Sequence, residues 1–193
     1  MTDKNFIQTR TELTKSLVGT LDYDEAIKLA KRVWSLRDTN NKIIFAGNGA
    51  SNTIANHAAL DYMSQIAVQT ISINDPAIIT AFSNDFGYDG ALERYCKINF
   101  KKGDLFVAVS SSGNSPNVVN AAKYVKSVGG HITALTGFDK DNKLKNVADS
   151  VLWVDSTYYN VVESIHNIWL AMVCDLLTEW MGNKAGLHGI ELD

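Results

Sequence analysis

Four serine hydroxyls lie within six residues of this chain, an arrangement that suits the binding of an anion. Residues 110–115, Ser-Ser-Ser-Gly-Asn-Ser (the serine loop), follow the apolar residues 105–109, which are typical of a strand buried on both faces. Ser115 occupies an N-cap position ahead of Pro116, where a helix is predicted to begin. Hydroxyl groups beside the free N–H groups of a helix N-terminus favour a phosphate. The alternative is a serine-rich turn that only caps the helix.

A histidine and an aspartate, His57 and Asp61, are four residues apart in a predicted helix and so share one face. Such a pair can supply two metal ligands, or a base and the group that orients it. The alternative is a structural histidine bonded to an aspartate one turn along.

The last predicted helix carries three polar residues, Glu163, His166 and Asn167, which their spacing places on one face. Glu163 can meet His57 and Asp61 across the site, or across a subunit boundary. It can equally be a solvated residue that the dipole at the start of the helix favours.

A second glycine-bearing loop, residues 47–51, reads Gly-Asn-Gly-Ala-Ser and follows another predicted strand. It lacks the third glycine of a dinucleotide fingerprint, and no lysine followed by serine or threonine completes a P-loop. The sequence therefore predicts neither NAD nor ATP as a cofactor. The small side chains let the backbone approach a sugar phosphate closely. Residues 84–87, Asn-Asp-Phe-Gly, form a turn signal between two short predicted helices.

An alternation of strands and helices must position these residues. Two helices are predicted within residues 5–38 and a long one over residues 160–180, and further helices separate the strands. This order predicts an α/β three-layer sandwich, with a five-stranded parallel sheet flanked by helices. Such sheets bind ligands at the carboxyl ends of their strands, where residues 47–51, 110–115 and 136–137 are small and polar. The predicted strands are residues 42–46, 68–73, 105–109, 131–135 and 150–154.

The N-terminal helical pair, residues 1–38, and the long C-terminal helix are more apolar than a thin α/β layer requires. Trp34, Trp169 and Trp180 all lie on these helices. The helices can cover the edge of the sheet within one chain, but we favour packing in an oligomeric bundle.

The composition indicates a single domain over residues 1–193, because 46% of the residues are hydrophobic and 20% are charged. A loose tail is expected over residues 182–193. The net charge of −3 comes without a block of Lys or Arg, so nucleic acid is not an expected partner. No apolar run approaches the length of a membrane span, and we expect no membrane partner and a cytoplasmic location. Cys96 and Cys174 lie in apolar helical patterns and are predicted to be reduced core thiols.

Taken together, these segments resemble the SIS (sugar isomerase) family, and within it the phosphoheptose isomerases. The segments that carry the resemblance are residues 47–51 with His57, residues 83–87, the serine loop with Asn117, residues 134–137, and the helix of Glu163 and His166. The resemblance covers nearly the whole chain and implies the SIS fold. It also implies a phosphorylated sugar as substrate and the conversion of sedoheptulose 7-phosphate to a heptose 7-phosphate. The family typically forms a homotetramer with active sites between subunits.

By that resemblance the family's phosphate loop falls on the serine loop, and two further segments contact the sugar. Asp61 and Glu163 are implied to be the catalytic carboxylates, one of which moves a proton between C1 and C2 through a cis-enediol. The implied substrate-binding residues are Asn48, Gly49, Ala50, Ser51, Asn84, Asp85, Ser110, Ser111, Ser112, Ser115 and Glu163.

The same resemblance implies zinc as a cofactor. The family's ligands, His, Glu, Gln and His, fall on His57, Asp61, Glu163 and Ala171. Alanine cannot bind metal, but three donors are enough for an open catalytic zinc site with water in the fourth position. The metal would polarise the carbonyl and stabilise the enediolate. His166 is one stand-in for the missing histidine, although it lies five residues before Ala171 and so points elsewhere on the helix.

Three functions remain open on the sequence. The first is the aldose–ketose isomerase described above. The second is a non-catalytic SIS module that senses a sugar phosphate or binds a protein partner, which the alanine at the ligand position would suit. The third is an isomerase for a different sugar phosphate that uses a rearranged acid/base pair.

Overall fold

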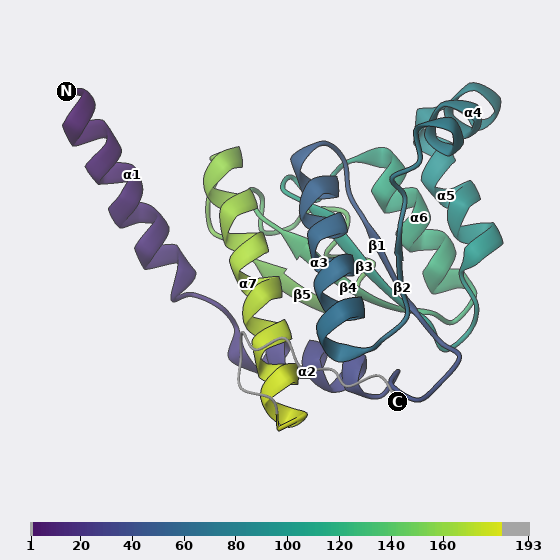
Figure 1. Cartoon of the computed structure of the whole chain (residues 1–193). Coiled ribbons are helices and arrows are strands. Elements are labelled where there is room, and N and C mark those ends of the chain that lie inside the picture. Colours follow the sequence, from purple (N-terminus) through teal and green to yellow (C-terminus); the bar gives the residue numbers. More distant parts are fainter. Residues whose placement is uncertain (1, 183–193) are drawn as a thin grey trace.

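Five parallel strands form the middle layer of the molecule, in the spatial order β2-β1-β3-β4-β5. The structure, a computed structural model, describes residues 2–182 (Figure 1). The predicted α/β sandwich with a five-stranded parallel sheet is confirmed. The strands are β1 (Ile43–Ala46), β2 (Thr70–Ser72), β3 (Leu105–Ser110), β4 (His131–Thr136) and β5 (Ser150–Trp153).

Helices cover both faces of this sheet. They are α1 (Asp3–Val18), α2 (Tyr23–Trp34), α3 (Ala50–Ile66), α4 (Pro76–Phe86), α5 (Tyr88–Asn99), α6 (Pro116–Ser127) and α7 (Tyr159–Trp180). The helices α2, α3 and α7 lie on one face, and α5 and α6 lie on the other, with α4 beside α5 (Figure 1). Helix α1 runs away from the body and packs against it through its C-terminal end, where Leu17 is buried.

Strand β3 shows why the sequence forms these layers. Leu105, Val107 and Val109 belong to the hydrophobic core shared with α2, α3 and α7. Phe106 and Ala108 belong to the core shared with α5 and α6. Successive side chains of a strand point to opposite faces, so a strand between two helical layers needs apolar residues at every position. The parallel direction brings the carboxyl ends of the strands, and the loops that follow them, to one edge of the sheet.

Several predicted boundaries differ from the structure by one or two residues, and two differences have a clear physical cause. Strand β3 extends one residue further than predicted, because Ser110 still pairs with Thr136 of β4. The turn predicted over residues 84–87 is largely helix: Asn84 and Asp85 lie in the last turn of α4. The chain changes direction at Gly87, whose φ of 71° costs a glycine little because it has no Cβ.

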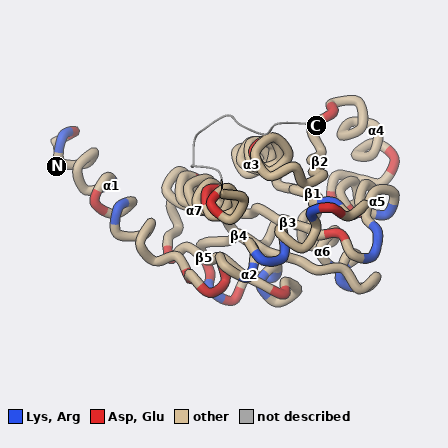
Figure 2. The backbone as a smooth tube through the Cα atoms, turned by 60° about the horizontal axis from the view of Figure 1, so that its bottom comes forward, with Lys and Arg blue, Asp and Glu red and all other residues tan. Residues whose placement is uncertain are grey.

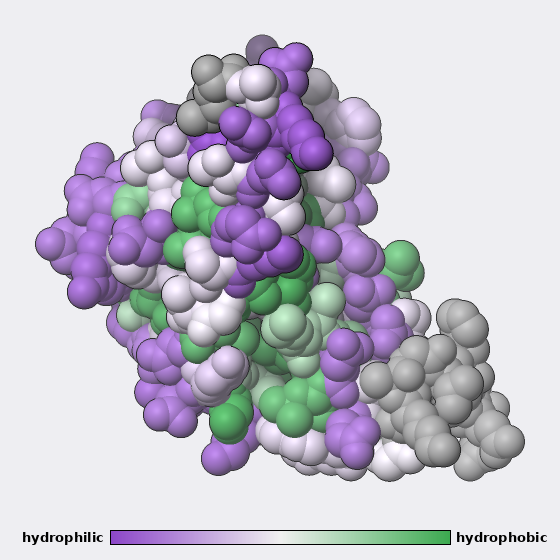
Figure 3. Space-filling model, turned by 90° about the vertical axis from the view of Figure 1, so that its left-hand side faces the viewer, coloured by the Kyte–Doolittle hydropathy of each residue, from purple (hydrophilic) through white to green (hydrophobic). Residues whose placement is uncertain are grey.

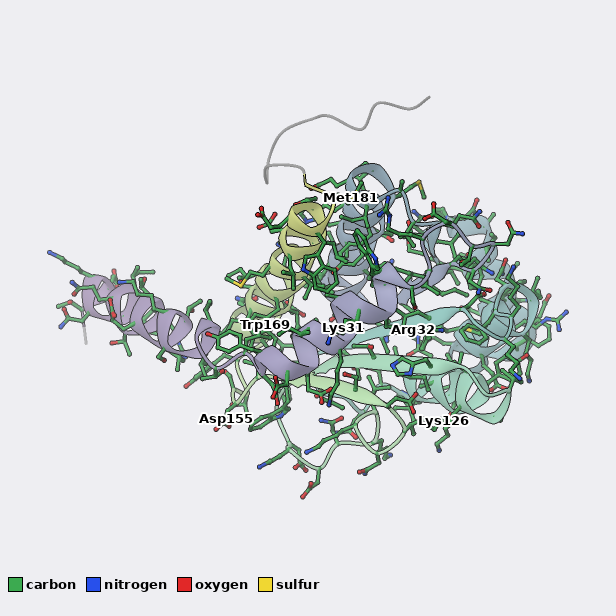
Figure 4. The ribbon with its side chains drawn as sticks, turned by 90° about the horizontal axis from the view of Figure 1, so that it is seen from below. Lys31, Arg32, Lys126, Asp155, Trp169 and Met181 are labelled. Carbon is green, nitrogen blue, oxygen red and sulfur yellow. The ribbon has the colours of Figure 1, made fainter. Side chains whose placement is uncertain are left out.

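The tryptophans of the terminal helices pack inside one chain. Trp169 of α7 is fully buried, and its indole N–H donates to the backbone oxygen of Val18 at 3.3 Å, at the junction of α1 and α2 (Figure 4). Trp34 of α2 and Trp180 of α7 meet edge to face, with ring centroids 5.7 Å apart. Helix α7 is therefore attached to both N-terminal helices within one chain. The packing of these helices in an oligomeric bundle stays a prediction.

Helix α7 is long and apolar enough, by length and composition, to cross a membrane, which corrects the expectation that no apolar run approaches that length. Its most apolar window is 56% buried, and the helix packs against α1, α2 and α3. These are the features of a core helix.

Cys96 and Cys174 are free and buried, as predicted, and burial raises the pKa of both thiols to about 12. The loose tail predicted over residues 182–193 lies outside the described residues, apart from Gly182.

Candidate active site

The serine loop joins the carboxyl end of β3 to the N-terminus of α6. Ser110 and Ser111 are buried, whereas Ser112 and Ser115 are partly exposed. The hydroxyl of Ser110 donates to that of Ser115 at 3.4 Å across the loop. The hydroxyls of Ser110 and Ser115 therefore meet at the sheet edge where ligands of this fold class bind, whereas the hydroxyl of Ser112 accepts from the N–H of Asn114 at 3.2 Å.

The connection after β4 braces the serine loop from the side. Gly113 has a φ of 63°, and a Cβ added there would lie 2.0 Å from Oδ1 of Asn142. Asn142 is buried and donates to the hydroxyl of Thr136 at 3.2 Å. The N–H of Gly137 donates to the carbonyl of Ser111 at 2.8 Å. The loop is thus a rigid element whose shape depends on the absence of a side chain at Gly113.

Two helices, α3 and α6, begin at this edge without a side-chain cap. Gly49 is the N-cap of α3, and Ser115 is the N-cap of α6, as predicted, but its hydroxyl makes no capping bond. The N–H groups of Ala50 and Ser51 in α3 and of Asn117 and Val118 in α6 therefore have no capping side chain, and both dipoles favour an anion. Helices α3 and α7 carry no Lys or Arg (Figure 2). The N–H and hydroxyl groups at the starts of α3 and α6 can donate to an anion bound at this edge.

The loop after β1 is tied to both neighbouring elements by the side chain of Asn48. Its Nδ2 donates to Oδ1 of Asn117 at 2.9 Å, and its Oδ1 accepts from Nδ2 of Asn117 at 2.8 Å. The hydroxyl of Tyr88 also donates to Oδ1 of Asn48, at 2.9 Å. Gly47 permits the close turn into α3, since a Cβ there would lie 2.7 Å from the backbone of Ser51.

A second polar cluster lies between α3 and α7. Nε2 of His57 is 3.3 Å from Oδ2 of Asp61, so the prediction that these two residues share a face is confirmed. Nδ1 of His57 is 3.1 Å from Oδ1 of Asn167 on α7. These three residues and Ala171 line one small pocket, and the histidine side chain is 53% exposed.

The three polar residues of α7 do not share one face, which corrects the prediction. The hydroxyl of Ser111 donates to Oε1 of Glu163 at 3.4 Å, so Glu163 adjoins the serine loop. His166 is fully buried instead, with Nε2 3.1 Å from the carbonyl oxygen of Thr136. Burial lowers the pKa of His166 to about 4. Its ring is neutral at neutral pH and anchors α7 to β4, so it does not stand in for a ligand at Ala171.

The predicted zinc ligands come together only in part. The 3.3 Å between His57 and Asp61 suits two donors that share a tetrahedral ion about 2 Å from each, and Asn167 is placed to orient the ring. Glu163, however, contacts Ser111, and Ala171 has no donor. Within residues 2–182, no group of three His, Cys, Asp or Glu side chains is placed to hold a metal ion. The described residues of one chain therefore do not fit a catalytic zinc, which needs three protein ligands.

The remaining predicted sugar-binding residues are spread along the same edge. Gly49 and Ala50 are exposed at the start of α3, and Ser51 is buried one residue later. Asn84 and Asp85 are exposed at the end of α4, where the amide of Asn84 donates to the carboxylate of Asp85 at 2.9 Å.

Sequence reasoning did not predict the partners of Tyr88, Asn117 or Asn167. Their partners are 40, 69 and 110 residues away along the chain, so no local spacing reveals them. One signal was available: Asn117 is a polar residue at a position of α6 that the apolar pattern marks as buried.

The comparisons with known proteins identify the family of the chain. The model of the SIS domain family matches residues 5–137. A phosphoheptose isomerase from Cytophaga hutchinsonii is 36% identical over 72% of this chain and 75% of its own length. One from Fusobacterium nucleatum is 30% identical over 78% of this chain and 80% of its own length. The solved structure of phosphoheptose isomerase from Neisseria gonorrhoeae has a TM-score of 0.82 and 25% identity, covering 91% of this chain and 96% of that one.

Proposed function

The chain belongs to the SIS domain family, and on that premise we propose that it is an aldose–ketose isomerase that converts sedoheptulose 7-phosphate to a heptose 7-phosphate. The observation that carries the proposal is the serine loop between two uncapped helix N-termini, with a His57–Asp61 pair on the neighbouring helix face. The first feature holds a phosphate, and the second can move a proton. The choice of reaction is supported by relatives at 30% and 36% identity, which are named phosphoheptose isomerases.

We expect the phosphate to be held by the hydroxyls of Ser110 and Ser115 and by the free N–H groups at the start of α6, where the dipole favours an anion. Glu163 lies against Ser111 at this end of the site. We expect it to contact the sugar beside the phosphate rather than the reacting carbons.

The chemistry moves one proton and shifts a carbonyl by one carbon. A carboxylate removes a proton from C1 of the ketose, and the electron pair forms the C1–C2 double bond of an enediol while the C2 carbonyl oxygen takes up a proton. A proton then returns to C2, and the O1 hydroxyl loses its proton as C1 becomes the aldehyde. Asp61 suits the carbon-proton transfer better than Glu163, because its partner His57 can exchange protons with the substrate oxygens.

Zinc stays a prediction. The described residues supply two converging donors, so no step above passes through a metal. A catalytic zinc here would need a third protein ligand in addition to His57 and Asp61.

We also propose a cytoplasmic homo-oligomer, a tetramer in the simplest case. The side of the molecule that carries α1 and α7 exposes hydrophobic side chains in its middle, with hydrophilic ones around them (Figure 3). Large apolar residues left exposed on α1, α3 and α7 include Phe6, Ile7, Leu60, Met63 and Met172. A monomer that exposes this much apolar surface is poorly soluble, whereas a helical bundle between subunits would bury it.

Incubation of the purified protein with sedoheptulose 7-phosphate, with and without added zinc, tests the proposal. We expect an aldose heptose 7-phosphate to accumulate toward equilibrium. Binding of the sugar phosphate without any turnover would instead identify the non-catalytic sensor. Turnover of another sugar phosphate but not of this one would indicate an isomerase with a different substrate.

A further inference from the structure

Three hydrogen bonds with two residues hold the side-chain amide of Asn48. They determine which of its donors and acceptors remain free for a ligand. A carboxamide has two acceptor positions on oxygen and two N–H donors. Both acceptor positions are engaged, by Asn117 at 2.8 Å and by Tyr88 at 2.9 Å. One N–H donates to Oδ1 of Asn117 at 2.9 Å. A single N–H donor remains.

The two partners reach Asn48 from different elements. Asn117 lies in the first turn of α6, directly after the serine loop, and is 5% exposed. Tyr88 is the first residue of α5. The reciprocal amide pair therefore joins the loop after β1 to the first turn of α6, and the hydroxyl of Tyr88 adds a third hydrogen bond that restrains the amide of Asn48.

A cavity of about 140 Å³ adjoins this network, and its chemistry indicates what lies near Asn48. The residues Asn48, Asn52, Ser83, Tyr88 and Asn117 contribute polar groups to it, and no lining residue among the described ones is charged. Oδ1 of Asn52 and Oγ of Ser83 are buried there without a hydrogen-bond partner in residues 2–182. Oδ1 of Asn52 can only accept a hydrogen bond, so it suits a sugar hydroxyl, which can donate, better than a phosphate dianion, which cannot.

We propose that Asn117 and Tyr88 are positioning residues that hold Asn48 as a hydrogen-bond donor toward a hydroxyl or carbonyl oxygen of the sugar chain, on the side of the uncharged cavity. The inference rests on the proposed isomerase function and assigns roles that the function alone does not. Asn48 would touch the substrate, whereas Asn117 and Tyr88 would act through Asn48.

The test is a double-mutant cycle measured by turnover of sedoheptulose 7-phosphate. Asn117→Ala should lower kcat/KM by about tenfold, and Tyr88→Phe by a smaller factor, because a misplaced donor loses transition-state contact. In an Asn48→Ala background, Asn117→Ala should cause little further loss, since the two act as one unit. Asn48→Asp should also lose activity, because its carboxylate still accepts from Asn117 and Tyr88 but has no N–H to donate.

Two measurements separate positioning from damage to the neighbouring serine loop. Competitive inhibition by inorganic phosphate should be unchanged in Asn117→Ala and Tyr88→Phe, since both variants keep the serine hydroxyls and the backbone N–H groups of α6. One matched control is Asn120→Ala, which removes the hydrogen bond that this α6 side chain donates to the backbone carbonyl of Asp89. The other is Tyr95→Phe on α5. Both variants should keep the wild-type kcat/KM.

The outcomes are distinct. An inactive wild-type protein would contradict both the proposed function and this inference. An active wild-type protein with additive losses at Asn48 and Asn117, or with weakened phosphate inhibition, would overturn the positioning role alone. Full activity of Asn48→Asp would contradict the donor role of Asn48.

Discussion

At the scale of single residues, the two carboxylates of the site have different surroundings. Asp61 is paired with His57 between α3 and α7, whereas Glu163 accepts a hydrogen bond from Ser111 of the serine loop. A carboxylate paired with a histidine is suited to proton transfer, and one beside a phosphate loop is suited to contact with the bound sugar.

We therefore predict that Asp61→Asn lowers kcat by at least about a hundredfold with little change in KM, since general acid–base groups contribute on that order. Glu163→Gln should give the smaller loss, about tenfold in kcat/KM. Steady-state kinetics of the two isosteric variants decides between them. The reverse order of losses would make Glu163 the base.

A second residue-scale prediction concerns Ala171. It lines the same small pocket as His57 and Asp61, so Ala171→His would add a third donor beside a pair already spaced for a metal. We expect this variant to bind zinc at least about tenfold more tightly than the wild-type protein. Zinc titration followed by metal analysis after dialysis measures the difference, with Ala171→Leu as the control of similar bulk. Equal zinc affinity in both variants would show that the pocket does not hold a metal.

Residue spacing predicted some contacts of the site and not others. The i, i+4 spacing of His57 and Asp61 was sufficient because both residues lie on one helix. The spacing of Glu163, His166 and Asn167 was not sufficient. Adjacent residues of a helix point in different directions, so the side chain of His166 enters the core while that of Asn167 contacts His57. The contacts of Asn48 depend on where β1, β3 and α5 meet, which no local pattern encodes.

At the scale of elements, α7 is held by a buried histidine whose protonation would break its packing. The ring of His166 is enclosed by the core, and its pKa of about 4 lies below the value of about 6.5 in an unfolded chain. Between these two values the unfolded chain binds the proton and the folded protein does not. The free energy of unfolding therefore rises with pH through this window and falls on acidification.

We predict that acidification from pH 6.5 to pH 4 removes on the order of 3 kcal/mol of stability through His166. Chemical denaturation of the wild-type protein and of His166→Gln across this range measures the effect. The glutamine can still donate to the carbonyl of Thr136 but does not titrate. Identical pH dependence in the two proteins would show that His166 does not couple folding to protonation.

Much of the element order was predictable because its cause is local. Apolar runs of four to six residues appear as buried strands, and Asp or Ser residues mark helix starts at Asp22, Asp75 and Ser115. The end of α4 was not predictable, since Asn84 and Asp85 resemble turn residues but continue a helix that only Gly87 stops.

At the scale of the whole molecule, helix α1, most of which is exposed, is the feature that most needs a second subunit. It extends from the body with Phe6 and Ile7 exposed (Figure 1). We predict that the wild-type protein has about four times the mass of one chain in solution, and that Ile7→Glu dissociates it at micromolar concentration because burying the charge costs several kcal/mol. Light scattering coupled to size exclusion measures the mass. The control Gln8→Glu, on a polar position of the same turn, should keep the wild-type mass. A monomeric wild-type protein would contradict the bundle.

The most direct test of the isomerase assignment follows the proton that the reaction moves. Purified protein is incubated with sedoheptulose 7-phosphate in D₂O, and the product is examined by NMR. The proposed mechanism predicts a heptose 7-phosphate that carries deuterium at C2, formed by the wild-type protein and lost in Asp61→Asn. Saturable binding of the sugar phosphate to the serine loop, with no aldose product and no deuterium incorporated, would contradict the proposed catalysis.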